Sequence, residues 1–323
     1  MTTMLDPSTI STSAMGATPA EHLRATMAAC RVQFTWLGTQ KSLSPEQRAR
    51  AAETFDAQGT SLSAGKKLLD QTHPAFKAVT AVRGKISSSW KNLTLPYTEP
   101  GVRLIPQEKI EEFDALMVDL RVELNAAVEH LDDRYGELKA AAVSRLGSLY
   151  NSADYPQSLV DLFAVAWDFP SVEPPDYLRQ LCPQVYEQER ARVAGRFEEA
   201  VRLAESAFLD EFTRLVEHLT ERISGANEDG NPKVFRESAI GNLTEFFDRF
   251  RTLNVRSNDQ LDSLVEQAQQ AVRGVKAQDL RDSEALRQRV ASRLAGVQSA
   301  LDGLLVDQPR RRILRDKITT GEA

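Results

Sequence analysis

Two long stretches of the chain carry the apolar spacing of amphipathic helices. Between Pro106 and Tyr150 there is no proline, and apolar residues recur at steps of three or four. A second stripe of this kind begins after Pro183 and ends at Ser224. Because a helix with one apolar stripe needs a packing partner, two stripes of similar length predict an antiparallel coiled-coil hairpin. We assign its arms to residues 106–150 and 183–224.

The segment between the two arms, residues 151–182, differs from them in composition. It is rich in proline and holds an apolar run from Leu159 to Phe169. We interpret it as an ordered insertion at the tip of the hairpin, either a buried tip helix or a docking element for a protein partner. Its candidate docking residues are Leu159, Leu162, Phe163, Trp167 and Phe169.

The N-terminal part, residues 21–105, mixes strand and helix signals. Apolar and polar residues alternate strictly from Cys30 to Trp36, which predicts a half-buried strand. A turn at Glu99-Pro100-Gly101 between two β-prone runs predicts a hairpin over 93–105, packed beside that strand. Helices are predicted after Ser44, which starts a capping box, and from about Pro74 to Trp90.

The remaining segments complete a fold that is mainly α with a small β element. Residues 1–20 are rich in Ser, Thr, Gly and Ala, and are interpreted as a flexible leader. Residues 226–309 carry helical spacing and predict a C-terminal helical part. A basic tail follows over 310–323.

Composition narrows the class of protein. The chain has 323 residues and a formal net charge of −6, which argues against a protein that coats nucleic acid. Its two cysteines, Cys30 and Cys182, form no disulfide framework or metal motif. Neither a membrane-spanning apolar run nor a signal peptide is recognisable, so we expect a cytoplasmic protein.

The sequence offers little catalytic chemistry. No histidines fall in a metal-ligand spacing, and adjacent carboxylates such as Asp132-Asp133 diverge on a helix. Gly65-Lys66-Lys67 resembles the end of a P-loop, but the spacing from Gly59 is one residue too long and Lys67 replaces the hydroxyl residue. We therefore predict no enzyme activity, no catalytic residues, no cofactor and no metal.

Two features keep other functions open. A basic cluster near the C-terminus could contact phosphate or an acidic partner, as in a nucleic-acid-associated accessory protein of a phage or mobile element. This cluster comprises Arg310, Arg311, Arg312, Arg315 and Lys317. The apolar run 159–169 could insert into a membrane, as in helical pore-forming proteins, although it covers about half a bilayer and carries Asp161 and Asp168.

Several short motifs resemble those of an uncharacterised family of phage, plasmid and bacterial proteins. They are the run from Trp36 to Leu43, the Gly65-Lys66-Lys67-Leu68 segment, Gly101-Val102-Arg103 before a long charged helix, and Trp167-Asp168-Phe169. The resemblance covers roughly residues 28–225. Members of that family are encoded beside a MoxR-type AAA ATPase and a von Willebrand factor A protein. The resemblance thus implies a non-enzymatic scaffold or adaptor with these two protein partners, and a homo-oligomer is a further arrangement to test.

Overall fold

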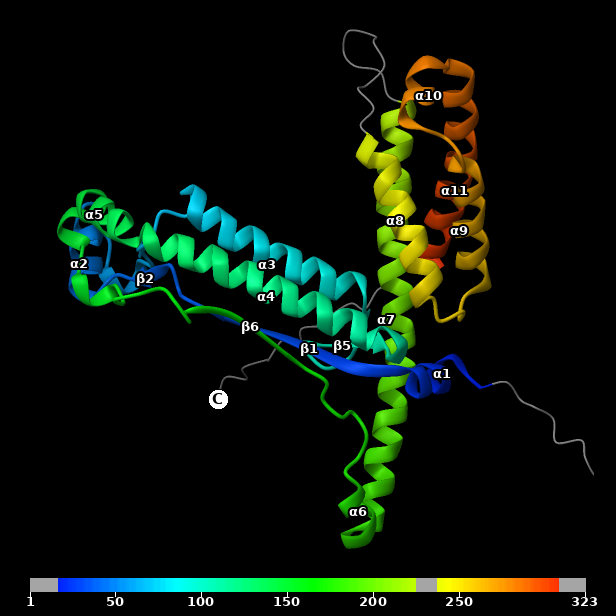
Figure 1. Ribbon diagram of the computed structural model, residues 1–323, viewed down its shortest axis with the longest axis horizontal. Helices are drawn as coiled ribbons and strands as arrows, with labels where there is room; N and C mark the ends of the chain where they lie inside the picture. Colours follow the sequence, from blue (N-terminus) through cyan, green and yellow to red (C-terminus); the bar gives the residue numbers. More distant parts are fainter. Residues whose placement is uncertain (1–16, 225–236, 308–323) are drawn as a thin grey trace, which may run out of the picture. The chain divides into compact units, whose positions relative to one another are not determined.

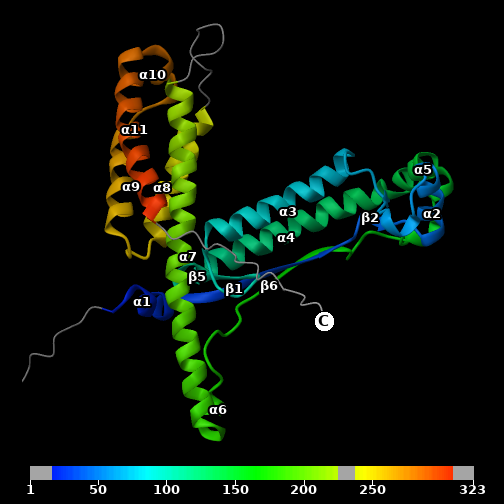
Figure 2. The ribbon, with the colours of Figure 1, turned by 180° about the vertical axis from the view of Figure 1, so that it is seen from behind.

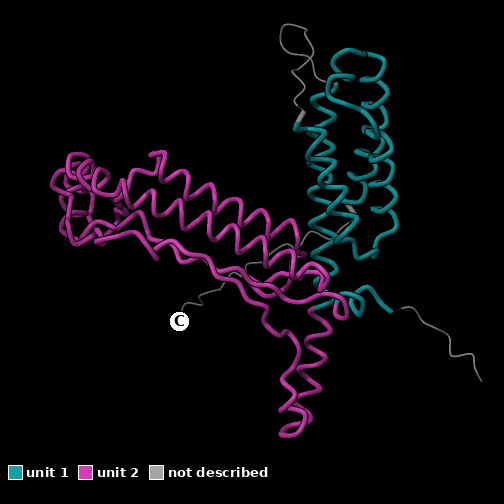
Figure 3. Tube along the Cα trace, viewed as in Figure 1, with its two compact units in different colours: residues 1–23, 197–323 teal, residues 24–196 magenta. Residues whose placement is uncertain are grey.

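A computed structural model describes residues 17–224 and 237–307 of the chain (Figure 1). The described part is mainly helical with a small antiparallel sheet, as the sequence predicts. It divides into two compact units (Figure 3). Unit 1 comprises residues 1–23 and 197–323, and unit 2 comprises residues 24–196. Two helices cross the boundary between these units in sequence, α1 (Pro19–Thr26) and α7 (Pro183–Ser224).

Unit 2 is built around a four-stranded sheet with the order β4-β5-β1-β6. The long strand β1 (Met27–Trp36) confirms the strand predicted from the alternation of apolar and polar residues. Its first half pairs antiparallel with β5 (Val102–Pro106), which pairs in turn with β4 (Leu95–Pro96). The predicted hairpin is therefore confirmed. Its turn contains Gly101, whose φ of 79° favours glycine.

The second half of β1 pairs with a strand that the sequence did not reveal, β6 (Phe163–Asp168). The register runs from Arg31 opposite Asp168 to Trp36 opposite Phe163. The prediction of a buried tip helix over this apolar run is wrong. Phe163, Val165 and Trp167 alternate with two alanines, and this period of two suits a strand with one covered face.

Two helices, α3 (Pro74–Asn92) and α4 (Ile110–Asp133), lie side by side along the β1–β6 ribbon (Figures 1 and 2). Their apolar stripes share one core with the covered face of the sheet. This core includes Phe76, Val79, Val82, Ile86, Phe113, Met117, Leu124, Val128, Cys30, Val32 and Phe163.

The predicted coiled-coil hairpin is wrong in two respects. Residues 106–150 do not form one helix, because α4 ends at Asp133 and α5 (Tyr135–Leu146) follows as a separate helix. The packing partner of α4 is α3, whereas the stripe of α7 packs against α8 (Glu237–Leu253) through aromatic contacts. An apolar stripe predicts that a helix is covered, but its spacing does not say by which element.

The remainder of unit 2 forms a small lobe at the far end of α4. It contains α2 (Pro45–Glu53), the two-stranded sheet of β2 (Gln40–Ser42) and β3 (Gly65–Lys67), and α5. Short 3-10 turns complete it: η1 (Gly59–Ser61), η3 (Gly147–Leu149) and η4 (Ser152–Asp154). A further 3-10 turn, η2 (Gln107–Lys109), precedes α4. The predicted capping box at Ser44 is confirmed.

Unit 1 is a helical bundle. The part of α7 from Phe197 onward packs with α8, and α9 (Asp259–Val272) packs with α8 and α11 (Glu284–Asp307). The short helix α10 (Ala277–Asp282) joins α9 to α11. Helix α1 begins at Pro19, inside the predicted leader. Residues 1–16 and the predicted basic contact, Arg310, Arg311, Arg312, Arg315 and Lys317, lie outside the described residues.

Candidate protein-interaction surface

Three of the exposed apolar residues of unit 2 lie on one helical projection, residues 175–192, which we call the helical tip. It consists of α6 (Asp176–Leu181) and the first turns of α7. Tyr177, Leu181 and Val185 are 61%, 73% and 42% exposed. Burial resumes at Val193, which is 3% exposed. The tip therefore presents large apolar side chains without a core behind them.

Local chemistry explains how the tip stays helical. Pro175 precedes α6, and Pro183 opens α7, where its missing N–H costs no hydrogen bond. Between the helices, the Cys182 amide donates to the Leu178 carbonyl at 2.8 Å, and the Tyr186 amide donates to the Cys182 carbonyl at 3.0 Å. Tyr177 and Leu181 are four residues apart in one helix and lie on the same face.

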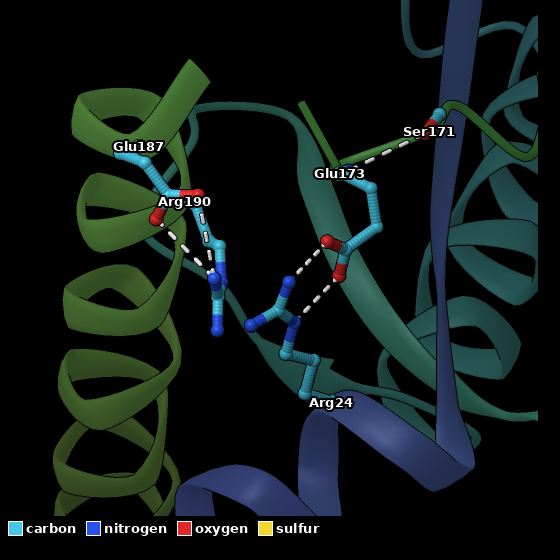
Figure 4. Close-up of polar contacts among 5 residues, drawn as sticks. All are labelled: Arg24, Ser171, Glu173, Glu187 and Arg190. Atoms are coloured by element: carbon cyan, nitrogen blue, oxygen red, sulfur yellow. Dashed lines mark hydrogen bonds and ion pairs between the residues drawn. The ribbon is translucent and has the colours of Figure 1, made fainter. Parts of the chain in front are cut away.

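Two arginine–carboxylate pairs hold the segment that leads to the tip, residues 168–175, which we call the strap. Arg31 of β1 donates to both carboxylate oxygens of Asp168, with 2.9 Å from Nε to Oδ1. Arg24 of α1 donates to both oxygens of Glu173, with 2.7 Å from Nε to Oε1 (Figure 4). Between these pairs the Glu173 amide donates to Ser171 Oγ. The strap is thus fixed at both ends to the N-terminal strand and helix.

The ion pairs of the strap also shift the pKa values of the side chains that form them. The hydrogen bond from Arg31 lowers the pKa of Asp168, and the hydrogen bond to Glu173 raises the pKa of Arg24. Figure 4 shows Glu187 and Arg190 of α7 beside the Arg24–Glu173 pair, joined by their own ion pair at 3.2 Å. The root of the tip is therefore a charged region, in contrast to its apolar end.

Removing one of the two arginine–carboxylate ion pairs should loosen the strap without unfolding unit 2. We expect Arg24→Gln to speed proteolytic cleavage between residues 168 and 175 several-fold, because the strap loses one of its two attachments and opens locally more often. Unit 2 should stay folded, because exposed ion pairs add only about 0–1 kcal/mol to global stability. Limited proteolysis followed by mass spectrometry measures this. Arg251→Gln, which removes an exposed pair with Asp248 on α8, is the matched control. An unchanged rate of cleavage in the strap would show that the Arg24–Glu173 ion pair does not restrain the strap.

The docking residues predicted from the sequence lie elsewhere. Leu159 and Phe163 are 0% and 1% exposed and belong to the core, so the prediction that they face a partner is wrong. Leu162 and Trp167 are partly buried against the same core. Phe169 remains 38% exposed and contacts Phe113 edge to face. Sequence reasoning missed Tyr177, Leu181 and Val185, although their four-residue spacing was a signal.

Two polar groups of unit 2, Cys30 and Lys66, are buried in its structure. Burial raises the pKa of the Cys30 thiol to about 12, which makes it a poor nucleophile. Lys66, from the P-loop-like segment, is buried and paired with Asp154. Within residues 17–224 and 237–307, no group of three or more His, Cys, Asp or Glu side chains is arranged to hold a metal. In the same residues, no helix is long and apolar enough to cross a membrane.

In comparisons with known proteins, no protein-family model, no curated protein and no solved structure matches the chain.

Proposed function

We propose that the protein is a non-enzymatic scaffold or adaptor that binds a protein partner through its helical tip. The observation that carries the proposal is the exposure of Tyr177, Leu181 and Val185 on one projecting helical segment. Clustered apolar residues on a surface mark interaction sites, and tyrosine is one of the residue types enriched among the hot spots of interfaces. The family resemblance supplies the partners to test first, a MoxR-type AAA ATPase and a von Willebrand factor A protein.

The geometry supports binding through an inserted helix. Apolar residues spaced by four along a helix fit a groove in a partner protein, with the helix as the inserted element. The strap fixes the root of the tip through the Arg24–Glu173 and Arg31–Asp168 ion pairs. A pre-ordered tip loses less conformational entropy on binding than a flexible segment would lose.

The test uses the full chain and a purified MoxR-type AAA ATPase. In the variant Y177S/L181D, we expect binding to weaken at least roughly 30-fold, because removal of an interface hot spot costs about 2 kcal/mol or more. Phe55→Asp, which changes a side chain 76% exposed on the small lobe, is the control and should leave binding unchanged. Circular dichroism checks that both variants keep their helix content.

Other outcomes would contradict the proposal. Equal binding by wild type and Y177S/L181D would exclude the tip as the docking site. Failure of the wild-type chain to bind either the ATPase or the von Willebrand factor A protein would remove the adaptor function with these partners. Retention on DNA that weakens steeply with salt would instead support the nucleic-acid alternative. Dye release from liposomes would support the membrane alternative.

A further inference from the structure

Strand β6 is an edge strand that lacks the usual protection of edges. It pairs with β1 on one side, and among the described strands none pairs with its other side. About half of its main-chain N–H and C=O groups point toward that open side, since such groups alternate along an antiparallel strand. Proteins commonly blunt open edges with proline, lysine or bulges. Residues Phe163–Asp168 contain neither proline nor lysine, their one charged side chain, Asp168, pairs with Arg31 of β1, and their register with β1 is unbroken.

Helix α4 runs alongside β6 in the opposite direction. Near its start, Asp114 accepts a hydrogen bond from Trp167 Nε1 at 2.7 Å. At its end, Asp132 accepts one from the Leu159 amide at 2.6 Å. The guanidinium of Arg121 lies 4.9 Å from the Trp167 ring, between these points. The side of α4 that carries Asp114 therefore faces β6.

Two exposed valines lie on the same side of α4. Val118 and Val122 are 37% and 63% exposed. Each follows Asp114 by a multiple of four residues, so Val118 lies about 40° around the helix from Asp114. It lies about 140° from Glu123, whose ion pair with Lys85 marks the side toward α3. Val118 thus turns away from α3, toward the open edge of β6, and Val122 lies about 80° from Asp114 and about 100° from Glu123.

Acidic residues flank this apolar strip. Exposed Glu111 lies one heptad before Val118, and exposed Glu129 lies one heptad after Val122. The two carboxylates are 18 positions apart, which spans about 27 Å along the helix and matches about eight residues of extended chain. Asp161, at the start of β6, is also exposed. The strip is therefore apolar in the middle and negatively charged at its ends.

We infer that the β6 edge binds an extended segment of a protein partner by strand addition. The open main-chain groups require an extended backbone as the occupant. The Val118–Val122 strip favours apolar side chains on the face toward α4, and the acidic ends favour a basic residue at each end of the segment. Exposed Ala166 on the opposite face leaves room for small or polar side chains there.

The second half of β1 offers a competing edge, since β5 pairs only with Met27–Arg31. On that side Arg83 of α3 lies over the rings of Phe34 and Trp36, 5.1 and 4.5 Å from their centroids. A basic segment would meet this cation there. Beside β6 it would meet one cation, Arg121, but also the carboxylates of Glu111, Glu129 and Asp161. The acidic ends of the strip therefore favour the β6 edge for a segment with basic ends.

The experiment measures hydrogen exchange of the full chain with and without a designed peptide, acetyl-Lys-Val-Thr-Val-Thr-Val-Thr-Lys-amide. We expect slowed exchange within Phe163–Asp168, and affinity about tenfold lower for the same peptide with glutamate ends. In a second peptide the backbone amides of all the threonines are N-methylated, and in a third peptide those of all the valines are N-methylated. Only one of these two should lose binding, by about tenfold or more, because only one set of amides faces β6.

A pair of protein variants completes the test. Val118→Asp should weaken peptide binding by about tenfold or more, because it places a carboxylate in the apolar strip. Val143→Asp, at a position 48% exposed on α5, should not change it. Three results would overturn the inference: no slowing at β6 with millimolar peptide, slowing over residues 32–36 instead of β6, or undiminished binding of both N-methylated peptides.

Discussion

Replacing Asp154 with alanine should destabilise unit 2 by about 3–5 kcal/mol, because the change leaves a buried lysine without its counter-charge. The side chains of Lys66 and Asp154 are 6% and 2% exposed, and Lys66 Nζ lies 2.6 Å from Asp154 Oδ2. The same ammonium donates to the Leu149 carbonyl at 2.6 Å. Lys41 pairs with the other oxygen of Asp154, but its side chain is 57% exposed.

Urea unfolding followed by tryptophan fluorescence measures this change. All three tryptophans, Trp36, Trp90 and Trp167, lie in unit 2, so the signal reports that unit. The double variant K66M/D154L removes both charges and should recover most of the lost stability. Lys41→Met should cost far less than Asp154→Ala, because Lys41 can be solvated. A loss below about 1 kcal/mol for Asp154→Ala would contradict a buried role for the pair.

The same pair adds a pH dependence. Hydrogen bonds from Lys41 and Lys66 lower the pKa of Asp154. In the unfolded chain this carboxyl has the ordinary aspartate pKa of about 3.9. Its contribution to stability is therefore complete above that pH and is lost as the pH falls through the lower, folded value. Acid unfolding of the wild-type chain should include this loss, and the D154L/K66M chain should lack it.

Local signals in the sequence predicted local structure well. The alternation from Cys30 to Trp36 is direct evidence of a strand, because it depends only on which face of the strand is covered. The capping box at Ser44 is equally local, since its hydrogen bonds join residues three positions apart. The helix from Pro74 follows from apolar spacing and an N-terminal proline. Each of these features is encoded within about ten to twenty neighbouring residues.

Contacts between elements far apart in the sequence could not be predicted from such local patterns. The stripe of α4 needed a cover, and either α3 or α7 could supply an apolar face, so spacing alone did not decide between them. Strand β6, one of the two partners of β1, lies 127 to 137 positions further along the chain, from Trp36–Phe163 to Arg31–Asp168. Lys66 looked like a solvated loop residue, because its counter-charge Asp154 is 88 positions further along the chain. The helical tip was missed because its apolar residues resemble those of any buried helix until the fold shows no core behind them.

Replacing Phe212 with alanine should have the largest effect in unit 1. Phe212 is fully buried and stacks on Phe246 of α8, with ring centroids 5.2 Å apart and an interplanar angle of 2°. It also meets Phe247 edge to face at 6.5 Å. Truncating a buried phenylalanine removes its apolar contacts and leaves a cavity, which costs about 3–5 kcal/mol. The contact between α7 and α8 should therefore open far more often.

Hydrogen exchange of the full chain measures this opening. A loss of 3 kcal/mol or more should speed exchange at the slowest amides of α7 and α8 at least roughly a hundredfold, where those amides exchange by opening of the bundle. Phe55→Ala removes the same side chain from a position 76% exposed and should leave these rates unchanged. Unchanged exchange in Phe212→Ala would mean that the aromatic stack does not hold α7 to α8, and that the bundle depends on the contacts of α9 and α11 instead.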